Sequence, residues 1–116
     1  MREIKFRIFD KQEEEFLNEE DYAINFVGTI FKACLDEEVF EVLDADRYIV
    51  TQYTGLKDKN GEEIYEYMEI DNTYEVSFLN GSYVLTNISN GDIILLSNYM
   101  ENNNGKVEIT REYTKV

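Results

Sequence analysis

The stretch covering residues 52–66 constrains the fold of this chain more than any other segment. An extended run rich in β-branched and aromatic residues, 48–54, leads into it, and this composition is typical of strands. The run is predicted to end at Gly55. A polar segment follows, in which the Asn60-Gly61 pair tolerates positive φ without a Cβ clash. With a second strand expected from Glu62, the stretch predicts a strand, a turn and a strand.

The pattern of the remaining chain predicts further short strands. Apolar and charged residues alternate over residues 3–9, which is the period-two pattern of a half-buried strand. The pairs Asn80-Gly81 and Asn90-Gly91 are strong hairpin signals. Short strands at this spacing predict a small barrel or a strongly bent sheet. The other expected strands are residues 23–30, 39–43, 64–70, 73–79, 82–88, 92–96 and 107–113.

Little helix is expected. Residues 11–21 are acidic and are interpreted as a short helix or a solvated loop, because segments that are polar all round rarely form stable helices unaided. Residues 31–35 are predicted to form a turn or a single helical turn. Residues 97–100 are predicted to form one helical turn.

The chain of 116 residues carries a net charge of −14. At this length it is most simply one compact domain over residues 1–116, mainly β (β-rich α+β). Its N-terminal part, 1–46, holds 14 acidic and 5 basic residues, so most of the acidic excess lies there rather than in 47–116. An acidic surface repels phosphates. We therefore expect no direct binding to nucleic acid, and a partner protein with a basic surface.

The composition argues against most classes of enzyme. The chain has no histidine and so lacks the side chain that most often acts as acid, base or metal ligand near neutral pH. No glycine-rich phosphate loop and no Ser or Cys nucleophile with a base can be assembled. Residues 58–62 lack the ligand spacing of a calcium loop. We expect no enzymatic activity, no catalytic residues, no cofactor and no metal site.

Two blocks of residues carry a family resemblance. One is the opening Met1-Arg2-Glu3-Ile4-Lys5-Phe6-Arg7 with the following pair Phe9-Asp10, and the other is Gln52-Tyr53-Thr54-Gly55-Leu56-Lys57-Asp58-Lys59-Asn60-Gly61. With these blocks the chain resembles the YopX family of small proteins encoded by phages and prophages of low-GC Gram-positive bacteria. The resemblance implies a phage or prophage origin and a small SH3-like barrel in the C-terminal part, with a β-rich N-terminal extension. It implies no established activity.

The chain departs from the family pattern in two places. After residues 64–66 the family usually continues Gly-Asp-Ile-Val, whereas this chain has Tyr67-Met68-Glu69-Ile70. We expect the bend that the glycine makes to be made differently at Tyr67. At the C-terminus, residues 108–113 replace the usual ending that contains Gly-Asn.

No apolar run approaches the ~18 residues that cross a bilayer. The N-terminus lacks the basic and then apolar pattern of a secretory signal. We therefore expect no membrane partner and a cytoplasmic location in the bacterial host cell.

Acidic clusters in the N-terminal part allow two interpretations. One is a solvated, solubilising surface. The other is imitation of nucleic acid, in which carboxylates occupy the basic groove of a host protein, and the resemblance to a phage family favours it. We expect a non-enzymatic accessory protein that inhibits a basic host protein that handles nucleic acid or defends against phage. The candidate partner-binding residues are Glu13, Glu14, Glu15, Glu19, Glu20, Asp21, Asp36, Glu37 and Glu38.

Two alternatives stay open. The chain could be a homo-oligomer that sequesters a small ligand such as a signalling nucleotide, because small folds often complete their burial by assembling. It could also be a structural protein with no dedicated ligand. The basic residues available for a ligand pocket are Lys5, Arg7, Lys57, Lys59 and Arg111.

Overall fold

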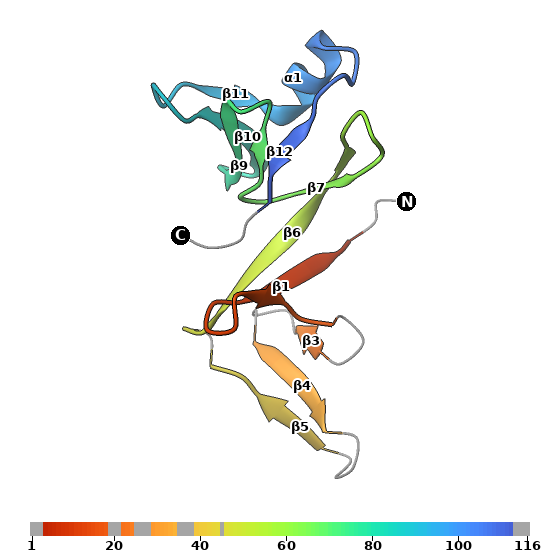
Figure 1. The fold of residues 1–116 in the computed structure, drawn as a ribbon, viewed down its shortest axis with the longest axis vertical. Helices are drawn as coiled ribbons and strands as arrows, with labels where there is room; N and C mark the ends of the chain where they lie inside the picture. Colours follow the sequence, from red (N-terminus) through yellow and green to blue (C-terminus); the bar gives the residue numbers. More distant parts are fainter. Residues whose placement is uncertain (1–3, 19–21, 25–28, 35–38, 45, 113–116) are drawn as a thin grey trace. The chain divides into compact units, whose positions relative to one another are not determined.

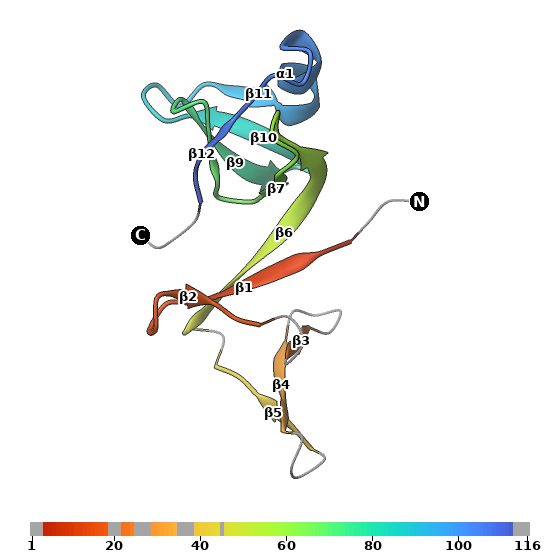
Figure 2. The ribbon, with the colours of Figure 1, turned by 45° about the vertical axis from the view of Figure 1, so that its right-hand side comes forward.

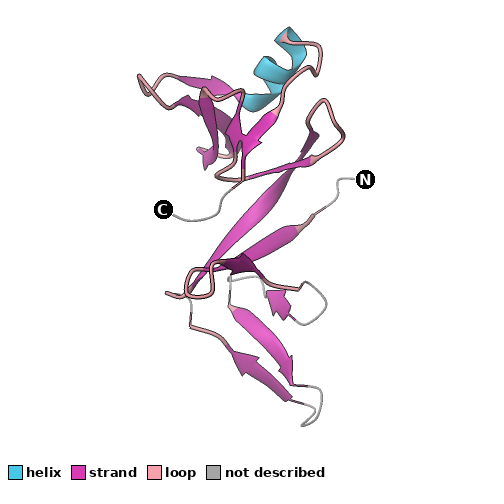
Figure 3. Cartoon of the chain, in the orientation of Figure 1, coloured by secondary structure: helices cyan, strands magenta, loops and turns pink. Residues whose placement is uncertain are grey.

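The computed structural model describes residues 4–18, 22–24, 29–34, 39–44 and 46–112. The chain falls into two compact units. Of the described residues, those between 6 and 50 belong to an N-terminal unit, and those at 4–5 and 51–112 belong to a C-terminal unit. Strands make up most of the described residues, with one helix among them (Figure 3). The mainly β class expected from the sequence is confirmed, and a single domain over 1–116 stays a prediction.

The N-terminal unit begins with a β-hairpin. Strand β1 (Phe6–Asp10) pairs antiparallel with β2 (Glu15–Phe16), so that Phe9 faces Phe16. The two rings pack edge to face with their centroids 5.1 Å apart. The segment interpreted from the sequence as a short helix or a solvated loop, 11–21, therefore begins with a turn and a short strand.

A three-stranded antiparallel sheet completes the N-terminal unit. Its order is β3-β4-β5 (Figure 1). Phe31 on the central strand faces Ala23 on one side and Val42 on the other. The three strands are β3 (Tyr22–Ile24), β4 (Ile30–Cys34) and β5 (Val39–Val42).

Two predictions from the sequence were wrong in this sheet. Residues 23–30 contribute to two strands rather than one, because they supply the end of β3 and the start of β4. Residues 31–35 were predicted to turn, but 31–34 lie within β4. A central strand has cross-strand partners on both sides, and this tertiary context overrides local preference.

Strand β6 (Tyr48–Lys57) runs further than predicted. Its first three residues belong to the N-terminal unit and the rest to the C-terminal unit, and the strand order of its sheet is β2-β1-β6-β7. Gly55, the predicted end, lies inside the strand at φ +89°, where the register with β7 (Glu63–Tyr65) shifts. A glycine bulge bends a strand without ending it. Near the start of the C-terminal unit, the Tyr53 N–H donates to the Lys5 carbonyl at 2.9 Å.

The C-terminal unit is built on a five-stranded antiparallel sheet with the order β11-β10-β9-β8-β12. The sheet curls into a half-barrel (Figure 2), so the expectation of a small barrel in this part is confirmed. A short helix, α1, follows β11, where one helical turn was predicted. The elements are β8 (Glu69–Ile70), β9 (Tyr74–Leu79), β10 (Ser82–Asn87), β11 (Ile93–Leu95), α1 (Leu96–Asn102) and β12 (Ile109–Arg111).

Both predicted Asn-Gly hairpins are present. Asn80 at φ +51° and Gly81 at φ +85° form the tight turn between β9 and β10, with the positive φ at both positions that a type I′ turn requires. Between β10 and β11 the turn is longer. There the Gly91 N–H donates to the Asn87 carbonyl at 2.8 Å, and the Asn87 N–H donates to the Asp92 carbonyl at 2.7 Å.

The core of the C-terminal unit lies against the inner face of the curled sheet. Val76 on β9 and Leu85 on β10 face each other there, and Ile94 on β11 continues the row. Burying each such side chain contributes about 1.5–3 kcal/mol. The members of the cluster are at most 1% exposed, and they are Ile64, Ile70, Val76, Leu85, Leu96 and Val107.

Candidate functional site

Three of the predicted partner-binding residues lie together on the hairpin of the N-terminal unit. Glu13, Glu14 and Glu15 are all exposed, on the turn between β1 and β2 and on the first residue of β2. We call these three residues the acidic turn. Glu14 has a φ of +56°, so the turn includes one residue in the left-handed region.

The Asp10 carboxylate holds the main chain of the acidic turn in place. Its Oδ1 accepts hydrogen bonds from the main-chain N–H of Gln12 at 3.0 Å and of Glu13 at 3.3 Å. Arg47 donates to the same carboxylate from Nε at 2.9 Å and from Nη2 at 2.7 Å. Asp10 is 3% exposed. A two-point pair of this kind fixes the direction of both side chains as well as adding energy.

The environment of Asp10 favours its charged form. The hydrogen bonds from Arg47, together with those from the amides of Glu13 and Gln12, lower the pKa of Asp10 to about 2 against the opposing effect of burial. The same pairing raises the pKa of Arg47 above its ordinary value. The ion pair therefore persists throughout the range in which proteins normally function.

The other candidate residues lie outside the described part of the chain. They are Glu19, Glu20, Asp21, Asp36, Glu37 and Glu38. The structure thus brings together one of the three predicted clusters and shows how it is held. Sequence reasoning missed Asp10 and Arg47 as its supports, because they are 37 residues apart and no local pattern links them.

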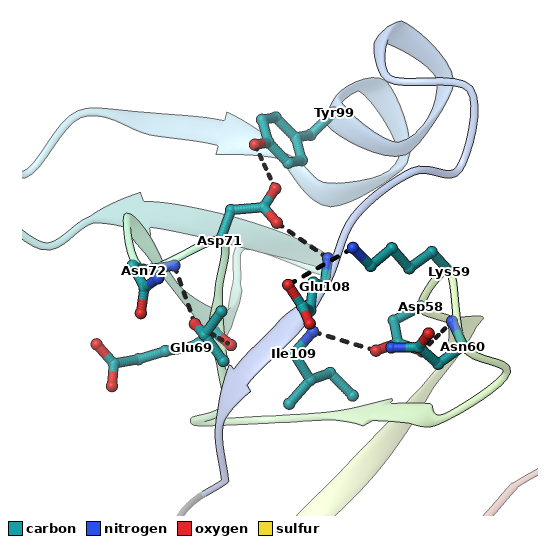
Figure 4. Close-up of polar contacts among 10 residues, drawn as sticks. Asp58, Lys59, Asn60, Glu69, Asp71, Asn72, Tyr99, Glu108 and Ile109 are labelled. Atoms are coloured by element: carbon teal, nitrogen blue, oxygen red, sulfur yellow. Dashed lines mark hydrogen bonds and ion pairs between the residues drawn. The ribbon is translucent and has the colours of Figure 1, made fainter.

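In the C-terminal unit, the turn that follows β6 is organised by one carboxylate (Figure 4). Asp58 is 7% exposed, and its Oδ1 accepts from the N–H of Asn60 at 2.9 Å and of Glu62 at 3.0 Å. Its Oδ2 accepts from the Ile109 N–H at 3.1 Å. Burial alone would raise the pKa of Asp58, but these three amide donors and nearby Lys59 outweigh it, and the pKa is lowered.

A second carboxylate holds the same C-terminal segment (Figure 4). Asp71 Oδ1 accepts from the Glu108 N–H at 2.9 Å, and its Oδ2 accepts from the Tyr99 hydroxyl at 2.7 Å. Burial and the bond to Asp71 raise the pKa of Tyr99 to about 12. Asp58 and Asp71 together fasten the start of β12 from two sides. The central stretch of the sequence therefore has a structural role in the C-terminal unit.

Four of the five basic residues considered for a ligand pocket are engaged elsewhere. Lys5 Nζ lies 2.7 Å from Glu63, Lys59 Nζ lies 3.6 Å from Glu108, and Arg111 lies 3.4 Å from Glu69. Each of these three cations thus has a different carboxylate as its neighbour. In the N-terminal unit, the Arg7 guanidinium lies 3.7 Å from the centroid of the Phe16 ring. Cation–π contacts of this kind stabilise an arginine in place.

Within the part of the chain that the structure describes, His, Cys, Asp and Glu form no group of three or more that could hold a metal ion. A search of the same residues finds no helix long and apolar enough to cross a membrane.

Comparison with known proteins decides the family. The model of the YopX family, described as "YopX protein", matches residues 5–109. The chain belongs to the YopX family. No curated protein matches it. Among solved structures, the crystal structure of protein EF1440 from Enterococcus faecalis is similar, with 19% identity and a TM-score of 0.59 over 98% of this chain and 95% of that chain. This likeness concerns the fold alone.

At one departure from the YopX pattern, the structure shows which backbone conformation the chain adopts. Tyr67 stands where the family usually has glycine, and it was expected to make the bend differently. Instead, Tyr67 adopts a φ of +68°, in the left-handed region that glycine favours. Its N–H donates to the Val76 carbonyl at 2.8 Å. The strand predicted over 64–70 is divided here into β7 and β8.

Proposed function

We propose that this YopX-family chain is a non-enzymatic accessory protein of a phage or prophage that binds a basic host protein through the acidic turn. The observation that carries the proposal is the way Glu13, Glu14 and Glu15 are presented. They are exposed on a turn that the buried Asp10 carboxylate holds in place through its pair with Arg47 and two main-chain hydrogen bonds. A binding surface that is ordered before contact loses less entropy on association.

Charge indicates the kind of partner. Adjacent carboxylates on a chain of net charge −14 attract Lys and Arg side chains and repel phosphates. A protein that handles nucleic acid presents such side chains in a groove built for phosphates. The acidic turn would occupy part of that groove and exclude the nucleic acid, which would inhibit the host protein.

The test is capture of partners from a nuclease-treated bacterial lysate at low and at high salt. The proposal expects a basic protein that binds at low salt and is released at high salt, because exposed charge pairs are screened. The variant Glu13→Lys, Glu14→Lys, Glu15→Lys should lose this protein.

A matched variant separates a local effect from a general one. Glu62, Glu101 and Glu112 are exposed acids of the C-terminal unit, and changing all three to Lys alters the net charge equally. This control should keep the partner. Equal loss in both variants would show that only net charge matters, and capture of the protein's own subunits alone would favour the oligomeric alternative.

A further inference from the structure

Strand β11 is an edge of the five-stranded sheet, with β10 as its neighbour in the strand order (Figure 1). The Asn87 N–H donates to the Asp92 carbonyl, and hydrogen-bonded pairs alternate along an antiparallel ladder. The next bonded pair is therefore Leu85 with Ile94. It follows that the main-chain groups of Ile93 and Leu95 are directed away from β10, toward the free edge.

The side chains beside this edge are apolar and accessible. Ile93 is 52% exposed and Leu95 is 42% exposed. By register they face Thr86 and Val84, on the side of the sheet opposite Leu85. Proteins often protect a strand edge with Lys, Pro or an inward-pointing charge, and β11 has none of these in its sequence; its protection is its length of three residues.

The charge beside the edge is negative. Asp92 directly precedes β11 and is exposed. Successive side chains of a strand point to opposite faces, so Asp92 lies on the face opposite Ile93 and Leu95. A cation placed beside β11 on that face would be attracted to the Asp92 carboxylate.

We propose that the free edge of β11 binds an extended, basic segment of another protein by strand addition. The Ile93 N–H and carbonyl and the Leu95 N–H pair with the main chain of the segment, as in other cases of β-augmentation. Apolar side chains of the segment cover Ile93 and Leu95, and its alternate Lys or Arg side chains lie on the opposite face of the sheet, beside the Asp92 carboxylate. A second copy of this chain fits less well, because each copy carries a net charge of −14.

This surface belongs to the C-terminal unit, whereas the acidic turn belongs to the N-terminal unit. The two proposals can therefore be tested independently. Reversal of the charges of the acidic turn leaves strand addition at β11 intact, and changes at Leu95 leave the acidic turn intact.

The probe is a capped peptide of about four Lys-Val repeats, a typical strand length, added to the full-length ¹⁵N-labelled protein. Binding should slow hydrogen exchange at the amides of Ile93 and Leu95, which have no ladder partner in the free protein. The amide of Ile94 is already bonded to β10 and serves as the internal reference. A Glu-Val peptide of equal length should not bind.

Leu95 allows a variant that removes only the donor. Its φ of −70° and ψ of 133° fit proline, so Leu95→Pro deletes the N–H without straining the backbone. Leu95→Ala keeps the N–H and truncates the side chain. We expect Leu95→Pro to bind the Lys-Val peptide about three- to tenfold more weakly than Leu95→Ala, the effect of one hydrogen bond.

Ile93→Lys gives an independent test, because a cation at the edge should repel the basic peptide. Several results would overturn the proposal: equal affinity of the proline and alanine variants, protection of amides elsewhere, no binding, or equal binding of the Glu-Val peptide. Protection of Ile93 and Leu95 in concentrated protein without peptide would identify a second copy as the occupant, and would also overturn it.

Discussion

Arg47 meets Asp10 through two parallel hydrogen bonds, and the same carboxylate receives two amides of the acidic turn. A single buried anion thus joins Arg47, the residue before β6, to the turn after β1. The charge of Asp10 is what keeps this arrangement together.

The first prediction concerns acid. The pKa of Asp10 is lowered to about 2 from an ordinary value of 3.8, chiefly by Arg47. Its contribution to the stability of the N-terminal unit is therefore fully present above about pH 4 and is lost as the pH falls through about 2. Carboxyl NMR shifts should titrate accordingly. A midpoint near 3.8, or an unchanged titration in Arg47→Ala, would contradict the assignment.

The second prediction concerns the turn after β6. Asp58→Ala removes the acceptor of three main-chain N–H groups and should lower the free energy of unfolding by about 2–4 kcal/mol, since partly buried donors lose their partner. Asp58→Asn keeps one oxygen and should cost less. Urea unfolding followed by circular dichroism measures both. As a control, Glu101→Ala, at an exposed position of α1, should change stability by less than about 0.5 kcal/mol.

The third prediction compares two substitutions of one residue. Both Tyr67→Gly and Tyr67→Ala remove the tyrosine side chain, but only glycine is unstrained at the φ of +68°. Tyr67→Gly should therefore be more stable than Tyr67→Ala by about 1 kcal/mol. The denaturant midpoints of the two variants measure this difference in stability. If alanine is equal to or better than glycine, the left-handed conformation at this position is wrong.

The fourth prediction concerns alkaline pH. Burial and Asp71 raise the pKa of Tyr99 from 10.0 to about 12. The folded state holds this proton more tightly than the unfolded state, so the stability due to Tyr99 is complete below about pH 10 and declines as the pH rises through 12. The difference in phenolate absorbance between the native protein and Tyr99→Phe isolates this group. A midpoint near 10 would contradict both the burial of this hydroxyl and its hydrogen bond to Asp71.

Turn chemistry was the most predictable part of the fold. Asn80-Gly81 fixed a hairpin because both residues tolerate positive φ, and both have it. The strand endings were less predictable. Gly55 was predicted to end its strand, but it forms a bulge inside β6. A glycine with positive φ can either end a strand or bend it, and the outcome depends on the pairing with the neighbouring strand.

The candidate site was predictable in its charge but not in its supports. The exposed position of Glu13–Glu15 followed from their number and spacing. The roles of Asp10, Asp58 and Asp71 did not, since a buried carboxylate is distinguished from a surface one by donors that come from distant segments. Tyr67 shows the same limit: its left-handed backbone goes against the preference of the residue itself and accompanies a hydrogen bond to Val76 on a strand that follows later in the chain.

The hydrogen bond from the Tyr53 N–H to the Lys5 carbonyl joins two positions that are far apart in the sequence. It places the point where the chain leaves the C-terminal unit beside the point where it returns, so residues 6–50 form an insertion between adjacent positions of one scaffold. Joining adjacent positions requires little loop closure, and domains tolerate exchange at such sites. The half-barrel can therefore stay constant while the inserted module, and with it the acidic turn, is replaced by another.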